Sequence, residues 1–444
     1  MIVDLKIFII IFLLVLGRDF KKGGKNYMRK SFIFLLLVFC FFISTFSDPN
    51  DPKLLNQLYL KSGSYGINWI KAWNEYEKGE PSIIISVIDT GVDMQHDDFN
   101  YPDEKTIFVQ GKNYFDGGND INNPDPYHPN PFGKYGDITP NLPESAEHGT
   151  AIIGIIAAIT NNSKGISGIA GGFGNYIKGI KVMPIRICDD VQSDNKEAQH
   201  AVDGINFSIT HNAKIMNLSW GIPYDEHIHK AITRSFQSHC IIVNALKSYS
   251  TDWDFPGYLS EVITVGSIEN QLSGGAIYLD IVAPSENIYT TKPKNSYKNV
   301  SGTSYSCAMV SGAIALLLSY NSTLTYSQIV SKLFLSTDDL GDPGWDRFYG
   351  WGKLNIHDMF RVITYTKEND WYNFKTMQYV GNNDWTFNLG TKSGDQNSYN
   401  ASFDEETSSN FNKHEIRTKI YFGKKYLLND NLKIRVYSNG IGNI

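Results

Sequence analysis

Three side chains that can act together in nucleophilic catalysis stand at the ends of predicted elements in this sequence. Asp89 ends the run "IIISVID", His148 opens "HGTAIIGIIAAIT", and Ser304 follows a glycine and a threonine in "SGTSYSCAMV". Nucleophilic catalysis needs a hydroxyl, a base that takes its proton and a carboxylate that orients the base. These residue types therefore predict attack by a serine on a carbonyl carbon.

Each of the three residues also has a purely structural interpretation. Asp89 is a plausible turn aspartate, His148 a helix-capping histidine, and Ser304 an N-cap serine, which is common at helix starts. Taken together, they favour a site, because the order Asp, His, Ser along the chain is one of the known orders of a catalytic triad. A serine at a helix start also lies where free backbone N–H groups converge, which suits an oxyanion.

The elements that must position these residues follow an alternating pattern between residues 80 and 363. Five of the six residues in 83–88 are apolar and β-branched, as in a strand that is buried on both faces of a parallel sheet. Such sheets carry working residues at the carboxyl ends of their strands. The pattern predicts an α/β fold with helices on both faces of a mainly parallel sheet. Strands are expected near 83–88, 179–187, 214–219, 240–244, 261–266 and 277–282, and helices near 149–159, 196–209, 225–237, 303–319, 325–336 and 355–361.

Three blocks of the sequence resemble the signature motifs of the subtilases, the subtilisin-like serine peptidases. They are "VIDTGVD", "HGTAIIGIIAA" and "SGTSYSCAMVSGAIALL", and weaker similarity extends over roughly residues 49–363. The resemblance implies the three-layer subtilisin architecture and a secreted serine endopeptidase. It also implies that Asp89 orients the base, His148 is the general base and acid, and Ser304 attacks the scissile carbonyl.

The same resemblance implies how a polypeptide substrate binds. The segment "KIMNLSWG" resembles the strand that lines the substrate cleft, so Ser219, Trp220 and Gly221 are expected to pair with an extended substrate. The backbone N–H of Ser304 is expected to be one oxyanion donor. The partners expected are polypeptides.

The position of the second oxyanion donor departs from the family pattern. Subtilases usually have an asparagine there, and the matching residue in "CIIVNALKSYS" is Lys247. Three interpretations stay open: Lys247 itself donates, Asn244 donates through a shifted loop, or the oxyanion site is incomplete. The last makes the chain a catalytically weak or inactive subtilase-fold protein that acts as a binding or surface module. Loss of one such donor costs about 10²–10³ in turnover. Leu246, where a glycine is usual, is expected to narrow the space for the substrate side chain just before the cut.

Calcium is the one cofactor that the resemblance suggests, in a structural role that the chemistry does not require. Asp98 and Asn162 stand at places where many subtilases hold calcium, and oxygen ligands suit this ion. Lys164, in the same loop as Asn162, adds an unfavourable positive charge. A second, weaker candidate is the Asn-, Pro- and Gly-rich loop that contains Asp116, Asp120 and Asp125, since loops of this kind are more often simply solvated.

The ends of the chain suggest three segments: 1–47, 48–364 and 365–444. Residues 31–46 form an apolar run after Met28, Arg29 and Lys30, which resembles a signal peptide with Met28 as the true start. The protein is therefore expected to be secreted or at the cell surface. The alternative is a membrane anchor, with membrane contact only if the apolar segment is retained.

Composition limits the remaining possibilities. The 444 residues carry a formal net charge of −6, which argues against nucleic acid as a partner. Residues 365–444 are aromatic and polar without helical periodicity. They predict a small β-rich region, to which the sequence assigns no role.

Overall fold

The computed structural model describes residues 48–103, 105–115, 146–188, 196–247, 254–269, 276, 278–342 and 344–361, together with the backbone of three later strands. The chain divides into two compact units, Met1–Asp48 and Pro49–Ile444. The predicted signal peptide lies outside the described residues, and so does the loop with Asp116, Asp120 and Asp125.

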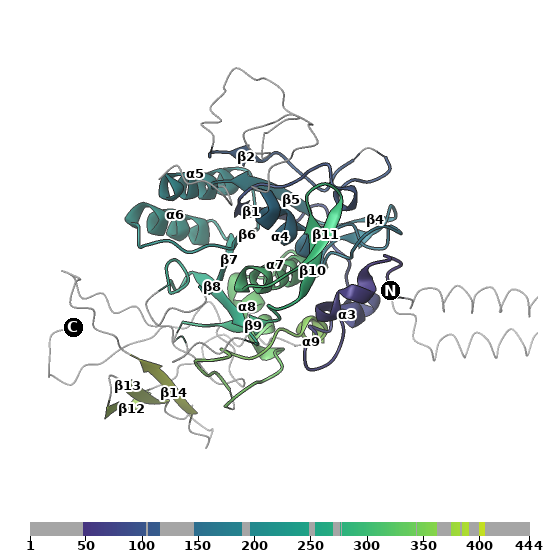
Figure 1. Cartoon of the computed structure of the whole chain (residues 1–444). Coiled ribbons are helices and arrows are strands. Elements are labelled where there is room, and N and C mark those ends of the chain that lie inside the picture. The colour runs from purple at the N-terminus through teal and green to yellow at the C-terminus, as the bar shows by residue number, and fades with distance from the viewer. Residues whose placement is uncertain are drawn as a thin grey trace, which may run out of the picture. The chain divides into compact units, whose positions relative to one another are not determined.

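A seven-stranded sheet, in which every strand pair is parallel, forms the centre of the second unit (Figure 1). Its strands are almost entirely buried, as expected for a sheet that is covered on both faces. The predicted α/β fold with a mainly parallel sheet is confirmed. In sheet order the strands are β2 (Lys112–Asn113), β5 (Lys181–Arg186), β1 (Ile84–Asp89), β6 (Ile215–Leu218), β7 (Ile241–Ala245), β8 (Val262–Ser267) and β9 (Ile281–Ala283).

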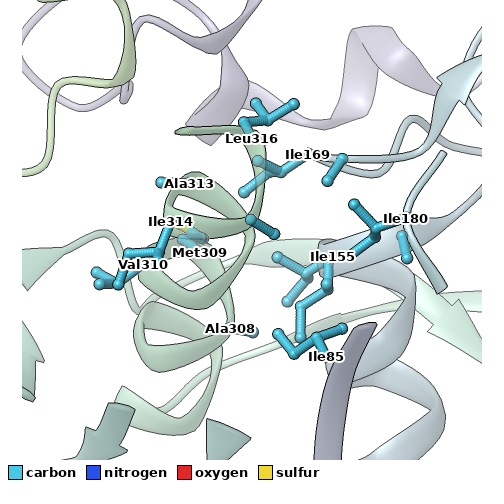
Figure 2. Packing of buried hydrophobic residues seen from close by; sticks show 14 of the residues in the cluster. Ile85, Ile155, Ile169, Ile180, Ala308, Met309, Val310, Ala313, Ile314 and Leu316 are labelled. Atoms are coloured by element: carbon cyan, nitrogen blue, oxygen red, sulfur yellow. The ribbon is translucent and has the colours of Figure 1, made fainter. Parts of the chain in front are cut away.

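Helices cover both faces of the sheet, and the sheet separates two large apolar clusters of the core. On one face α4 (Glu147–Ala157) and α7 (Thr303–Tyr320) pack against the strands, and Figure 2 shows apolar side chains of α7 near Ile85, Ile155 and Ile169. On the other face α5 (Glu197–Thr210) and α6 (Glu226–Gln237) bury a second apolar cluster. These two layers hold the ends of the strands in fixed positions.

Helix α7 has the length and hydropathy of a membrane span, and it is the one such helix among the described residues. Most of it is buried, and it contacts four strands of the central sheet. Its apolar character is therefore explained by its place in the core.

Smaller elements complete the unit. The sequence did not predict α3 (Trp69–Glu75) or the antiparallel hairpin of β10 (Ile288–Lys292) and β11 (Ser296–Val300), which packs on α4. The hairpin is polar and turns at Lys294 and Asn295, both with positive φ, so no apolar periodicity marks it. The others are η1 (Leu54–Asn56), η2 (Leu58–Leu60), η3 (Asp97–Phe99), β3 (Gly172–Phe173), β4 (Ile177–Lys178), α8 (Tyr326–Leu335) and α9 (Ile356–Arg361).

Three strands are described in the C-terminal region: β12 (Phe374–Gly381), β13 (Asp384–Leu389) and β14 (Tyr399–Asp404). They form an antiparallel sheet in this order. This agrees with the β-rich character expected from the sequence.

Candidate active site

Asp89 is the last residue of β1, at the carboxyl end of the central sheet, and its side chain is buried, with 2% of the residue exposed. Its Oδ1 accepts hydrogen bonds from the backbone N–H of Thr90 at 2.7 Å and from Nδ1 of His148 at 2.8 Å. The other oxygen, Oδ2, is buried and has no hydrogen-bond partner among the residues that the structure describes. The two bonds compensate the cost of burying a carboxylate and fix the direction of the imidazole.

His148 lies in the first turn of α4, one residue after the start of the helix. The next residue, Gly149, donates its N–H to Oγ1 of Thr90 at 3.1 Å, and a side chain at this position would collide with the carbonyl of Gly91. This close approach explains the glycine after the histidine. The side chain of His148 is 26% exposed, and its ring centroid lies 5.7 Å from that of Tyr305.

Ser304 is the second residue of α7, directly before Tyr305, so the start of this helix lies beside the imidazole. The helix begins after Gly302, whose φ of +145° favours glycine. Oγ of Ser304 donates to the carbonyl of Ser219 at 3.3 Å, and Oγ of Ser219 donates to the carbonyl of Ser304 at 3.2 Å. The structure thus brings all three residues that the sequence singled out to one end of the sheet.

Known proteins resemble this chain in sequence and in fold. A profile described as "Subtilase family" matches residues 80–352, more than half of the chain. The chain belongs to the subtilase family. It is 26% identical to subtilisin DY of Bacillus licheniformis over 305 residues, which are 66% of this chain and 96% of that protein. It is 27% identical to thermitase of Thermoactinomyces vulgaris, over 70% of this chain and 98% of that one.

Two further proteases are similar to this chain, one in sequence and one in structure. The major intracellular serine protease of Bacillus subtilis is 29% identical over 61% of this subtilase and 82% of its own length. A solved protease of Pseudoalteromonas arctica has a TM-score of 0.55 and 21% identity, and the match covers 71% of this chain and 99% of that one. The solved structure supports the fold, and the family supports serine peptidase activity in general.

In this subtilase Asn217, a fully buried residue of β6, stabilises the edge Ser219–Gly221. Its Nδ2 donates to Oγ of Ser219 at 2.9 Å, and its Oδ1 accepts from Oγ of Ser311, on α7, also at 2.9 Å. Asn217 therefore connects the edge to the helix that carries Ser304. Its role was not predicted from the sequence, although an asparagine inside the apolar run "KIMNLSW" is a usable signal.

The structure separates the two candidates for the second oxyanion donor. Asn244 is buried in β7, and its Nδ2 donates to the carbonyls of Leu218 at 2.8 Å and Trp220 at 2.7 Å. Both of its amide hydrogens are taken up by these two carbonyls, so Asn244 is not placed to donate to an oxyanion at Ser304. Lys247 is exposed, two residues beyond the end of β7.

Leu246 differs from the sequence-based expectation that it narrows the space next to the cut. Its side chain is buried in a separate apolar cluster with Ala276, Tyr278, Leu279 and Val282. Its carbonyl accepts a hydrogen bond from Oγ1 of Thr303 at 2.6 Å, which ties this segment to the start of α7. Burial of this side chain depends on apolar residues from a distant segment of the chain, which sequence alone does not reveal.

A second acidic side chain, besides Asp89, lies close to the edge and was not predicted from the sequence. Asp254 is buried, with Oδ2 accepting the backbone N–H of Lys247. A Cβ atom on Gly221 would lie 2.7 Å from its Oδ1. Burial raises the pKa of Asp254 to about 6, and the N–H and charge of Lys247 oppose that rise. No motif marks this aspartate, because a loop brings it to the site.

The two predicted calcium ligands occupy neighbouring parts of one network. Oδ2 of Asp98 accepts from the backbone N–H of Ile166 and the hydroxyl of Tyr297, both at 3.0 Å, and Oδ1 is buried with no hydrogen-bond partner in the described part of the chain. Oδ1 of Asn162 accepts the N–H of Lys164 at 2.8 Å. Within the described part of the chain, no group of three or more His, Cys, Asp or Glu side chains is arranged to hold a metal ion.

Proposed function

We propose that this subtilase is a serine endopeptidase that cleaves polypeptides through an acyl-enzyme on Ser304. The observation that carries the proposal is the Asp89–His148 hydrogen bond at 2.8 Å, at the end of the sheet where α7 begins with Ser304 as its second residue. A carboxylate that fixes an imidazole beside a serine hydroxyl is the arrangement that activates serine as a nucleophile.

The proposed reaction has two halves. Oγ of Ser304 attacks the scissile carbonyl and gives its proton to Nε2 of His148, while Asp89 stabilises the imidazolium. The backbone N–H of Ser304 donates to the oxyanion, aided by its place at the N-terminus of α7. His148 then protonates the leaving amine and activates the water that hydrolyses the acyl-enzyme.

A fluorophosphonate probe tests this proposal directly, because it reacts with activated serines. Wild type is expected to be labelled at Ser304, whereas Ser304→Ala is not. Ser301→Ala is the matched control, since Ser301 is exposed and lies three residues earlier, outside the proposed triad. Labelling that persists in Ser304→Ala, or is absent from folded wild type, would favour the alternative of a binding or surface module.

Lys247 is the observation that supports the alternative of weak catalysis, and its replacement gives a specific prediction. We expect Lys247→Asn to raise kcat on a peptide substrate by between about 10-fold and 10³-fold, because it restores an amide donor near the oxyanion. Steady-state kinetics with active-site titration measures the change. Lys247→Ala is the control, because it removes the ammonium without adding an amide.

The two variants separate the open interpretations of Lys247. If Lys247→Ala lowers kcat and Lys247→Asn does not raise it, the ammonium is itself the donor. If neither variant changes kcat, the oxyanion donor is at another position and the alignment of Lys247 with the family asparagine is wrong.

We propose calcium as a structural ion at Asp98, whose surroundings fit a cation. Its Oδ1 has no partner, and burial raises the pKa of Asp98 to about 7, with nearby Asp51 adding to the rise. Two buried carboxylates close together favour a divalent ion over separate charges. When bound, calcium would order the loop around Asn162 and Ile166, and it would take no part in the peptidase chemistry.

Calcium is therefore expected to raise the melting temperature of the protein above its value in excess chelator. At 100 times its Kd, a ligand that binds only the folded state stabilises it by about 2.7 kcal/mol. Differential scanning fluorimetry measures the shift. In Asp98→Asn the shift is expected to disappear, whereas in Asp97→Asn, which changes an exposed neighbour, it persists. A wild-type melting temperature that is independent of calcium contradicts the site.

We also propose that the protein is exported. The support comes from residues 28–47, with a basic start and an apolar run. The relatives do not decide the matter, because one of them is named as intracellular. The N-terminal sequence of the mature protein from a secreting host distinguishes cleavage near Asp48 from a retained anchor.

A further inference from the structure

A buried carboxylate beside the proposed catalytic residues has no part in the peptidase mechanism described above. Asp254 is 6% exposed, and its Oδ2 accepts the backbone N–H of Lys247. Its Oδ1 faces the backbone of Gly221, and none of the described residues donates a hydrogen bond to this oxygen. Asp254 is thus an acidic group at the edge Ser219–Gly221, where a substrate is expected to bind.

The start of α7 contacts two segments that follow neighbouring strands. Oγ of Ser304 donates to the carbonyl of Ser219, after β6, at 3.3 Å. Oγ1 of Thr303 donates to the carbonyl of Leu246, after β7, at 2.6 Å. The nucleophile is thus flanked by the edge Ser219–Gly221 on one side and by residues 245–247 on the other.

Asp254 contacts these same two segments. It accepts a hydrogen bond from the backbone N–H of Lys247 and lies against Gly221, and the carbonyl of the following residue, Phe255, accepts the N–H of Ile222 at 3.1 Å. The carboxylate therefore lies between the two segments that flank Ser304. Because Gly221 has no side chain, Oδ1 can lie against the backbone of the edge, and a larger residue at this position would collide with the carboxylate.

The charge of Asp254 lacks a partner of opposite charge in hydrogen-bond contact among the described residues. Lys247 affects it through its backbone N–H and at longer range through its charge, and the ammonium is exposed. A desolvated carboxylate without such a partner favours a cation that brings its own hydrogen-bond donors. Lysine and arginine side chains are such groups.

This inference rests on the proposed peptidase function and names its substrate class. We propose that Asp254 selects substrates with lysine or arginine as the residue whose carbonyl Ser304 attacks. A substrate that pairs with the edge Ser219–Gly221 projects alternate side chains to either side of its backbone. The side chain next to the cut enters between the edge and residues 245–247, toward the carboxylate.

The test compares peptide substrates that differ only in this residue, with lysine, arginine, leucine or glutamate. In wild type we expect kcat/KM for lysine and arginine to exceed that for leucine. In Asp254→Asn the ratio of lysine to leucine is expected to fall by about 10–100-fold, while kcat/KM for leucine changes little. Asp254→Glu is expected to retain the preference, because it keeps the charge.

The controls separate a specificity role from a structural one. Glu226→Gln removes one negative charge from the exposed surface of α6 and is expected to leave the ratio unchanged. The leucine substrate and fluorophosphonate labelling report on the triad in each variant, so a folding defect lowers all substrates together and leaves the ratio intact. Labelled enzyme with equal ratios in wild type and Asp254→Asn overturns the role of Asp254 but not the peptidase. Absence of both labelling and cleavage overturns both.

Discussion

Replacing Ser304 by alanine is expected to lower kcat for peptide hydrolysis by about 10⁶-fold while KM changes little, because the hydroxyl acts only in forming the acyl-enzyme. The geometry of the site also predicts how a second substitution, at His148, affects the rate. Since His148 serves Ser304 by taking its proton, His148→Ala alone should cost about as much, and the double variant should be no slower than either single one. Single-turnover kinetics on one peptide substrate measures all three.

Ser301→Ala and Ser304→Ala are compared for thermal unfolding in the same experiment, so that a loss of activity is not a loss of fold. The substitution removes one long hydrogen bond, from Oγ of Ser304 to the carbonyl of Ser219 at 3.3 Å, and should change stability by less than about 1 kcal/mol. Losses that add up, with the double variant far below both single variants, would mean that the histidine and the serine act independently and that no triad exists.

The features that the sequence predicted correctly are those with a local physical signature. The strand before Asp89 is marked by β-branched residues, and the helix after His148 by small and apolar ones. Each catalytic candidate follows or precedes a glycine that a sharp turn or close contact requires, as at Gly302. Because parallel strands all end at one edge of the sheet, local patterns were enough to place these residues together.

The features that the sequence missed depend on contacts between distant segments. Asp254 lies at the edge because its segment runs beside Ile222, and no sequence pattern around Asp254 predicts this contact. Leu246 was expected to narrow the space next to the cut, but its side chain is buried against apolar residues between Ala276 and Val282, which lie far along the chain. Asn217 contacts Ser311 on α7 across 94 positions of the chain. Such tertiary partners have no periodicity for a single sequence to display.

Replacing Asp89 by asparagine is expected to lower kcat/KM by about 10⁴-fold without unfolding the protein. Oδ1 of Asp89 accepts from both Thr90 and His148, so the oxygen of asparagine can take this place. The hydrogen bonds then persist, but the charge that stabilises the imidazolium is lost, and an NH₂ group occupies the buried position of Oδ2, which has no partner. If the amide instead turns round, its nitrogen faces the N–H of Thr90 and forces the proton of His148 onto Nε2, where it blocks proton transfer from Ser304.

Both orientations of the amide impair His148 as a base. Two measurements separate the loss of catalysis from the loss of stability. The rate of fluorophosphonate labelling reports on activation of Ser304, and thermal unfolding reports on the buried amide, which should cost about 1–3 kcal/mol. Asp97→Asn removes the same charge from an exposed position nearby and should keep both values close to wild type. If Asp89→Asn labels and cleaves at the wild-type rate, the carboxylate does not serve His148, and the short bond between them is structural. That outcome would mean that His148 activates Ser304 without the charge of Asp89, and it would overturn the role of Asp89 in the proposed triad.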